Sequence, residues 1–385
     1  MDERNKKKVG IVTLYHNTMN YGGLLQAYSL QKVLTELGCD AEILDIENVP
    51  FNGKMGHMSY VGPRRAFEVL WRKSFYWLLI KMNKTLSAEI EHRTKYFRSF
   101  AASIPHSKMY KHDDLQAFED VYDSYITGSD QVWNPGYWNN ALLLNFVRNK
   151  RKISYAASLG VTSYSVDEKQ ILKKALADYY AISVRECGGR KVLKEITNKP
   201  VEVVLDPTLL VDAEYWRSIA EPVELEGPYA FLFTVKDGAE HRKAVYNYCR
   251  SAGVKLVTIP YTQLHFRFSD VQYSDVQLSE IGPRQWIWLI DNAQYVFTDS
   301  FHGTAFSINL RKNFWSFEDE RDDNGDVGTQ RIGSLLSQLG LIDRRVSFTN
   351  LPCREQLDVP VDYSNVTDKM DALIKQSVHF LKDNI

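Results

Sequence analysis

The chain lacks the features that mark several protein classes. It has few cysteines, and Cys39, Cys187, Cys249 and Cys353 lie far apart with no C-x-x-C pair. This spacing fits reduced thiols in a cytosolic protein better than a disulfide framework or a zinc site. No run approaches the ~20 apolar residues that span a bilayer, and the apolar run at residues 9–14 is too short for a signal-peptide core. We therefore expect a cytoplasmic protein.

An excess of charge of one sign is also missing. The formal net charge is −1 at pH 7, and the basic residues are spread along the chain, so no global field favours nucleic acid as a partner. The sequence contains no repeat of fixed period and no low-complexity segment. Its 385 residues suggest two domains, because single cores stop growing beyond roughly 250–300 residues.

Short apolar runs alternate with helical patterns along the chain, which is typical of parallel sheets covered by helices. The first unit is a strand at 9–14, a helix over 24–37 and a strand at 41–46. Further strands are expected at 121–127, 152–157, 181–184, 201–205, 229–235, 254–259, 295–298 and 313–317. A polar, proline-flanked linker at 221–228 divides the two alternations.

This pattern predicts an α/β protein with two Rossmann-like doubly wound domains. The N-terminal domain is expected over residues 1–222 and the C-terminal domain over residues 223–385. The last helix, expected over 367–381, is able to return to the N-terminal domain. The sequence leaves the oligomeric state open.

The segment from Asp299 to Thr304 is the most informative. A buried strand ends at Thr298 and a helical pattern begins near Ala305, so His302 and Gly303 stand at the carboxyl end of a strand, where open α/β sheets bind ligands. Glycine lets backbone approach a ligand, a helix start favours anions, and an imidazole can carry a proton near neutral pH. A helix cap or a satisfied core histidine is the alternative.

Two loops in the first half also follow expected strands. Residues 17–23 contain a single glycine pair. This spacing fits a tight turn that exposes polar groups to a cleft better than a loop that binds the phosphates of a nucleotide. Residues 127–135 offer polar groups suited to sugar hydroxyls and a tryptophan with a flat face, although a turn that caps a helix explains them equally well. The candidate ligand-binding residues of these two loops are Asn20, Tyr21, Gly22, Gly23, Ser129, Asp130, Gln131 and Trp133.

Arg185 directly follows the strand expected at 181–184 and precedes a helix. Its guanidinium would project from the edge formed by the carboxyl ends of the strands. Arginine is the side chain best suited to bind a carboxylate or phosphate through two parallel hydrogen bonds. A surface ion pair with Glu186 is the alternative.

Two further segments carry charge. Residues 318–326 are rich in carboxylates, but their spacing does not match a calcium loop, so we expect a solvated acidic loop and no metal site. Residues 64–84 form a basic, aromatic helix that could lie on an anionic membrane surface. It could equally pack under the cleft or against a second subunit.

Four segments, in order, resemble the polysaccharide pyruvyl transferase family. They are residues 20–28, 128–134, 183–186 and 300–304. Asp206-Pro207-Thr208 and the late Arg331-Ile332 are similar to the family as well. The resemblance implies two Rossmann-like domains arranged as in GT-B glycosyltransferases. It also implies transfer of an enolpyruvyl-derived unit from phosphoenolpyruvate to a sugar, giving a pyruvate ketal.

The resemblance assigns the donor side of the site to the second half of the cleft. His302 would be the catalytic acid/base, with Asp299 or Asp206 orienting it. Some members have an arginine two places before that histidine, where this chain has Ser300, so another cation must supply the charge. Arg331 is the first choice, with Lys236 and Arg284 as alternatives. The implied donor-binding residues are Arg185, Ser300, Gly303, Thr304, Arg331 and Lys236. The resemblance makes the candidate residues of the two first-half loops, from Asn20 to Gly23 and from Ser129 to Trp133, the implied acceptor-binding residues.

The expected reaction needs no cofactor beyond phosphoenolpyruvate as donor substrate. The acceptor could be a lipid-linked oligosaccharide, which would place the protein at the inner face of the cell membrane through residues 64–84. Two rival interpretations share the architecture: a GT-B glycosyltransferase that uses a nucleotide sugar, and a non-catalytic carbohydrate-binding relative.

Overall fold

The computed structural model describes residues 6–49, 62–119, 121–236, 238–260, 267–318, 331–349 and 351–385. Of the acidic loop expected at 318–326, only Glu318 lies within these ranges. Its side chain is buried rather than solvated, and its two carboxylate oxygens accept hydrogen bonds from the backbone N–H groups of Ile332 and Gly333.

The first half of the chain forms a parallel six-stranded sheet in the order β2-β1-β3-β4-β5-β6. Its strands are β1 (Lys8–Val12), β2 (Asp40–Ile43), β3 (Ser124–Thr127), β4 (Arg151–Ala157), β5 (Ala181–Val184) and β6 (Val201–Val203). β3 is buried along its whole length, as expected for a central strand covered on both faces. The strand order reverses between β1 and β3, so the ligand crevice of this domain is expected there.

The second half forms another parallel six-stranded sheet, in the order β12-β11-β10-β7-β8-β9. Its strands are β7 (Tyr229–Phe233), β8 (Lys255–Thr258), β9 (Val276–Gln277), β10 (Tyr295–Thr298), β11 (Phe314–Phe317) and β12 (Arg345–Val346). β9 and β12 were not predicted, because two residues are too short for a periodic pattern. The order reverses between β7 and β10, and His302 follows β10.

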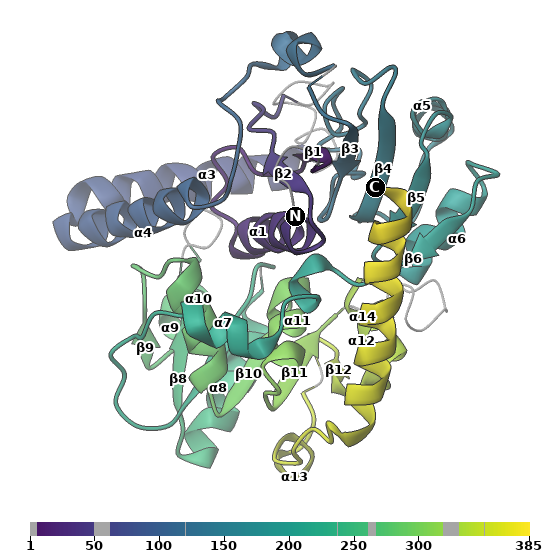
Figure 1. The fold of residues 1–385 in the computed structure, drawn as a ribbon. Helices are drawn as coiled ribbons and strands as arrows, with labels where there is room; N and C mark the ends of the chain where they lie inside the picture. The colour runs from purple at the N-terminus through teal and green to yellow at the C-terminus, as the bar shows by residue number, and fades with distance from the viewer. Residues whose placement is uncertain are drawn as a thin grey trace.

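Helices flank both sheets (Figure 1). In the first half they are α1 (Tyr21–Glu36), α3 (Gly62–Met82), α4 (Lys84–Ala102), α5 (Val166–Leu176), α6 (Cys187–Lys194) and α7 (Ala213–Ile219). In the second half they are α8 (Glu240–Ala252), α9 (Phe268–Gln272), α10 (Pro283–Asn292), α11 (Phe301–Asn309), α12 (Arg331–Leu339), α13 (Arg354–Leu357) and α14 (Ser364–Asn384).

Two helices begin earlier than the sequence pattern predicts. α1 begins at Tyr21 rather than at residue 24, and α11 begins at Phe301 rather than at residue 304. In each case a polar side chain, that of Asn20 or Ser300, accepts a hydrogen bond from the backbone N–H three residues later and caps the helix. The loops expected near Gly22 and His302 are therefore first turns of helices.

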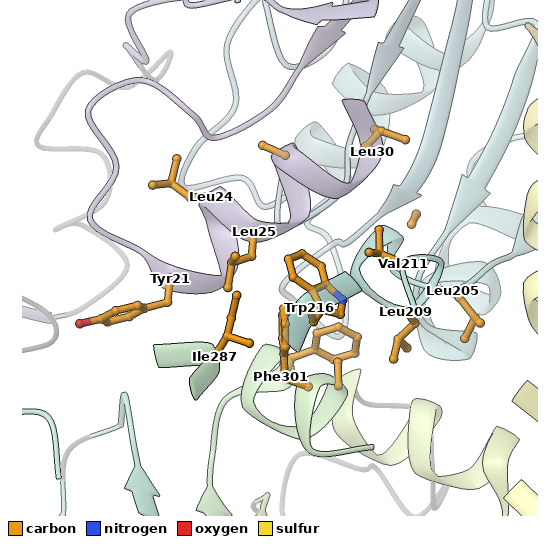
Figure 2. Close-up of a cluster of buried hydrophobic side chains, with 14 of the residues drawn as sticks. Tyr21, Leu24, Leu25, Leu30, Leu205, Leu209, Val211, Trp216, Ile287 and Phe301 are labelled. Atoms are coloured by element: carbon orange, nitrogen blue, oxygen red, sulfur yellow. The ribbon is translucent and has the colours of Figure 1, made fainter. Parts of the chain in front are cut away.

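The two halves share one apolar core, which fixes their relative position. Tyr21 stacks on Trp286 of α10, and its hydroxyl donates to the carbonyl of Ile281. Figure 2 shows Leu25 of α1 and Ile287 of α10 pointing toward each other across this contact. Because these side chains come from both halves, the carboxyl ends of the two sheets meet at a fixed position.

Two connections cross between the halves. α7 precedes the expected domain boundary but packs on the second half, where Trp216 lies against Phe306 with ring centroids 4.8 Å apart. α14 runs back along the first half (Figure 1), where Ser377 Oγ accepts a hydrogen bond from the backbone N–H of Leu205. The chain end, Ile385, accepts a hydrogen bond from Lys7 Nζ.

Candidate active site

Polar residues that follow four parallel strands meet where the two halves join. Arg185 directly follows β5, Asp206 comes shortly after β6, and Ser129 follows β3. His302 follows β10 and lies in the first turn of α11. The structure therefore brings together Arg185 and His302, which the sequence placed in different halves of the chain.

Arg185 and Asp206 form the buried centre of the site. Arg185 Nη1 donates to Asp206 Oδ2 at 2.7 Å, and the two side chains are 1% and 0% exposed. Ser129 Oγ donates to the same carboxylate oxygen at 2.8 Å. The other oxygen accepts hydrogen bonds from the backbone N–H and hydroxyl of Thr208. Burial alone would raise the pKa of the Asp206 carboxyl, but His302 and Arg185 hold that pKa well below its usual range.

His302 reaches this pair through one ring nitrogen. Its Nε2 lies 3.5 Å from Asp206 Oδ2 and 3.5 Å from Arg185 Nη1. When Nε2 carries a proton, it can donate to the carboxylate. When it does not, it can accept from the guanidinium. Both protonation states of the imidazole therefore have a partner, which suits a group that gains and loses a proton.

The other side of the imidazole is covered by the first domain. A side chain at Gly22, in the first turn of α1, would overlap His302 Nδ1. Only glycine allows this approach. Gly22, expected among the acceptor-binding residues, therefore helps to hold the imidazole in place.

The guanidinium of Arg185 is buried, but not all of its nitrogens have hydrogen-bond partners among the described residues. Its planar face lies 3.9 Å from the centroid of the Phe301 ring. Carboxylates of Asp130 and Glu186 lie 3.7 and 3.9 Å from Nη2 and Nε. Neither of these nitrogens has a hydrogen-bond partner among the described residues. Buried N–H groups normally find partners, so two donors remain for an anionic or carbonyl ligand.

Glu186 is buried beside Arg185 rather than paired with it at the surface, so the surface ion pair is excluded. Its Oε1 accepts hydrogen bonds from Ser158 Oγ and the backbone N–H of Leu159, while Oε2 has no hydrogen-bond partner among the described residues. Burial raises the pKa of the Glu186 carboxyl, against the opposing pull of Arg185 and, more weakly, Arg331. Arg331, at the start of α12, thus lies within electrostatic reach of the site.

The candidate cations differ in their surroundings. The Lys236 ammonium lies over the Phe348 ring, 5.0 Å from its centroid. Arg284 donates to the carbonyl of Ile219 and lies 3.7 Å from Glu221, where it holds the linker. Of the three, Arg331 is the one whose charge acts on Glu186.

Asp299 does not hydrogen-bond to His302. Its two oxygens accept hydrogen bonds from the backbone N–H groups of Val235 and Lys236. It therefore ties the loop after β7 to the end of β10. The carboxylate beside His302 is that of Asp206, the alternative named from the sequence.

The prediction that the ring of Trp133 offers a flat face to a sugar is wrong. The residue is fully buried and its ring packs edge-on to Tyr179 in the core of the first domain, so it has no face open to a ligand. Tyr21 is likewise committed to the contact between the halves.

The remaining candidates have local structural partners. Gln131 accepts a hydrogen bond from Asn134. A side chain at Gly23 or Gly303 would meet Asn20 or Thr298. Thr304 Oγ1 pairs with Ser316 Oγ at 2.7 Å and donates to the carbonyl of Ser300 at 3.1 Å, so its hydroxyl has partners within the second domain.

Neither Phe301 nor Glu186 was predicted to take part in the site. Each is the direct neighbour of a residue that was predicted, His302 or Arg185. The sequence did contain an indication for Glu186, because an acidic residue next to an arginine at the end of a strand can be buried together with it. No local signal indicated that Phe301 would cover the guanidinium from the other domain.

The fold and the site define a two-domain, Rossmann-like protein of the GT-B type with an arginine, carboxylate and histidine cluster in its cleft. The chain belongs to the polysaccharide pyruvyl transferase family, whose model matches residues 20–320. Membership supports a transferase that modifies polysaccharides. No curated protein matches the sequence.

Solved structures with a similar fold are distant in sequence. A putative UDP-N-acetylglucosamine 2-epimerase from Listeria monocytogenes is 11% identical, with a TM-score of 0.50 and coverage of 98% of this chain and 97% of that one. AviGT4, a glycosyltransferase involved in avilamycin A biosynthesis, is 11% identical, with a TM-score of 0.49 and the same coverage. At such low identity the likeness shows the fold alone.

Proposed function

We propose that the protein transfers a pyruvyl unit from phosphoenolpyruvate to a sugar of a polysaccharide or lipid-linked oligosaccharide, forming a pyruvate ketal and releasing phosphate. The observation that carries this proposal is the buried Arg185 guanidinium beside the ring of His302, with two nitrogens, Nε and Nη2, that have no hydrogen-bond partner among the described residues. The family supplies the reaction class, and these two residues supply groups suited to its donor.

Phosphoenolpyruvate carries a carboxylate and a phosphate, so it needs cations and N–H donors in a site shielded from water. Arg185 Nε and Nη2 are available for one of these anions. The first turns of α1 and α11 meet at Gly22 and His302, and helix starts favour negative charge. Arg331 is the further cation that compensates for Ser300.

The reaction has two bond-forming steps at one carbon. A proton adds to the methylene carbon of phosphoenolpyruvate while a sugar hydroxyl oxygen bonds to the neighbouring carbon and loses its proton. The bond from that carbon to the phosphate oxygen then breaks, and inorganic phosphate leaves. A second sugar hydroxyl bonds to the same carbon and closes the ketal, its proton leaving with the phosphate.

His302 is the group we assign to proton transfer. Its Nε2 has a partner in either protonation state, and Asp206 holds the ring and offsets the charge that it gains. Removing a general acid/base typically costs 10²- to 10⁴-fold in rate. We assign the sugar acceptor to the first-domain side of the site, near Asn20 and Ser129.

The deciding experiment measures phosphate release from phosphoenolpyruvate in the presence of lipid-linked and nitrophenyl sugars. We expect release with at least one sugar, a product heavier by one pyruvyl unit, and a loss of at least ~100-fold in His302→Ala. Thermal stabilisation by a nucleotide sugar, with none by phosphoenolpyruvate, would instead favour a glycosyltransferase. Unchanged ligand binding and turnover in His302→Ala would indicate a non-catalytic relative.

A further inference from the structure

The hairpin of α3 and α4 projects from the body of the molecule (Figure 1) and exposes large apolar side chains. Trp77 is 59% and Met82 76% exposed. The exposed apolar residues of α3 are Phe67, Leu70, Trp71, Trp77, Leu78 and Met82; we call them the α3 stripe. Contiguous apolar surface of this kind marks a site of interaction with a partner or a membrane.

The spacing of the α3 stripe places it on one face of the helix. Its members recur three, four or seven residues apart, and at about 100° per residue they fall within about 140° of the helix circumference. Tyr76 falls on the opposite side, where it is buried with Leu86 of α4. The stripe therefore faces away from α4 and extends for about 22 Å along the helix.

Most of the charged residues in the segment that carries the stripe are basic. Glu68 is the only acidic residue between positions 62 and 84. The ammonium of Lys81 lies 3.7 Å from the centroid of the Trp77 ring, with its charge at the edge of the apolar face. The basic residues of this part with described side chains are Arg72, Lys73, Lys81 and Lys84.

Aromatic residues flanked by lysine and arginine characterise helices that lie in the membrane interface. Anionic headgroups supply the complementary charge. A second copy of this chain would instead bring the same positive charges together across a symmetric contact, where like charges repel. No helix among the described residues is long and apolar enough to cross a membrane, so the contact is with the surface.

We propose that α3 docks this protein on an anionic lipid bilayer, with the α3 stripe at the level of the headgroups and its basic neighbours against lipid phosphates. This inference does not rest on the proposed reaction, because docking is measured without substrate. If the acceptor is lipid-linked, docking brings the cleft to the surface that carries it.

The test is flotation of the full-length protein with vesicles of phosphatidylglycerol and phosphatidylcholine, compared with vesicles of phosphatidylcholine alone. We expect binding to the anionic vesicles, weakened by salt. Trp71→Ser with Trp77→Ser should weaken binding at least ~10-fold. Replacing Arg72, Lys73 and Lys81 by Gln should remove the preference for anionic vesicles.

A matched control is Tyr180→Ser, which removes another exposed ring with a cation over it, here Arg151 at 4.3 Å. It should bind vesicles like the unaltered protein. Substitutions of exposed residues rarely change stability much, and circular dichroism checks that each variant folds. Equal binding by all variants, no binding to anionic vesicles, or a dimer that dissociates on Trp77→Ser would each overturn the proposal.

Discussion

Gly22 of the first domain lies directly against the imidazole of His302 in the second, and leaves no room for a side chain at position 22. The ring therefore lies between α1 and the Arg185–Asp206 pair. Its Nε2 is 3.5 Å from Asp206 Oδ2 and 3.5 Å from Arg185 Nη1. The backbone of one domain thus sets the orientation of the proposed acid/base of the other.

Replacing Gly22 by Ala should displace the imidazole and lower turnover by about 100-fold, the usual scale for losing a positioned acid/base. The overlap is with a buried ring, so unfolding should also become easier by about 1–3 kcal/mol. Phosphate release and thermal unfolding measure the two effects separately.

The double variant Gly22→Ala with His302→Ala shows whether the effect passes through the ring. If Gly22→Ala acts only by moving His302, the double variant should be no slower than His302→Ala, because the coupled residues are not additive. Additive losses would mean that Gly22 contributes in another way, for instance by contacting a substrate.

Asp206→Asn keeps the size of the side chain but removes the charge between Arg185 and His302. The guanidinium would keep only the more distant carboxylates of Asp130 and Glu186. Breaking a buried ion pair costs about 3 kcal/mol or more, and turnover should fall as well. Chemical unfolding at neutral pH measures the loss of stability.

The pH dependence of that loss has a defined sign. His302 and Arg185 hold the pKa of Asp206 below its usual range in the folded protein, so its charge stabilises the fold above the unfolded pKa of about 3.9. This contribution disappears as the pH falls through the folded pKa. The difference in unfolding free energy between the unaltered protein and Asp206→Asn should therefore shrink below about pH 4. A constant difference would contradict the charge assignment.

Much of the fold could be predicted because buried parallel strands are locally distinctive. The strands at 181–184 and 295–298 have the predicted bounds. The positions of Arg185 and His302 could be predicted because each lies close after the end of such a strand, at or near the start of a helix. Their meeting could not be predicted, because it depends on the apolar contact of α1 with α10, whose residues lie far apart in the chain.

The errors at the site have tertiary causes. Trp133 looks like a sugar platform by type, yet core packing against Tyr179 decides its burial. Asp299 is nearer to His302 in the sequence than Asp206 is. Its carboxylate oxygens, however, accept hydrogen bonds from backbone N–H groups that follow β7. Asp206, brought in from the other domain, takes the position beside the imidazole.

Arg185→Lys should weaken phosphoenolpyruvate binding while retaining a positive charge. Lysine cannot present the planar fork whose Nε and Nη2 are unpaired. We expect the KM for phosphoenolpyruvate to rise at least ~10-fold, the loss of one charge-assisted hydrogen bond. Initial rates over a range of phosphoenolpyruvate concentrations measure it.

Arg344→Lys is the matched control. Arg344 is also buried, and its guanidinium donates to Asn313 and to the carbonyls of Val359 and Pro360 in the second domain. It should lose stability without a change in the KM for phosphoenolpyruvate. Equal effects of the two variants on KM would show that Arg185 acts through general packing.

The cation that compensates for Ser300 can be identified by comparing Arg331 with Lys236. The charge of Arg331 acts on Glu186 beside Arg185, whereas the Lys236 ammonium lies over Phe348. We therefore expect Arg331→Gln to raise the KM for phosphoenolpyruvate about 10-fold and Lys236→Gln to leave it nearly unchanged. Steady-state kinetics of both variants decide between them.

Ser300→Arg tests the same assignment in the opposite direction. It restores the arginine found in some family members, at a cost of about 0.5–2 kcal/mol because Ser300 caps α11. If Arg331 supplies the missing charge, Ser300→Arg should recover part of the phosphoenolpyruvate affinity lost in Arg331→Gln. Recovery in Lys236→Gln instead, after a loss there, would assign the role to Lys236. A Ser300→Arg substitution that rescues neither variant would mean that position 300 does not face the donor in this chain.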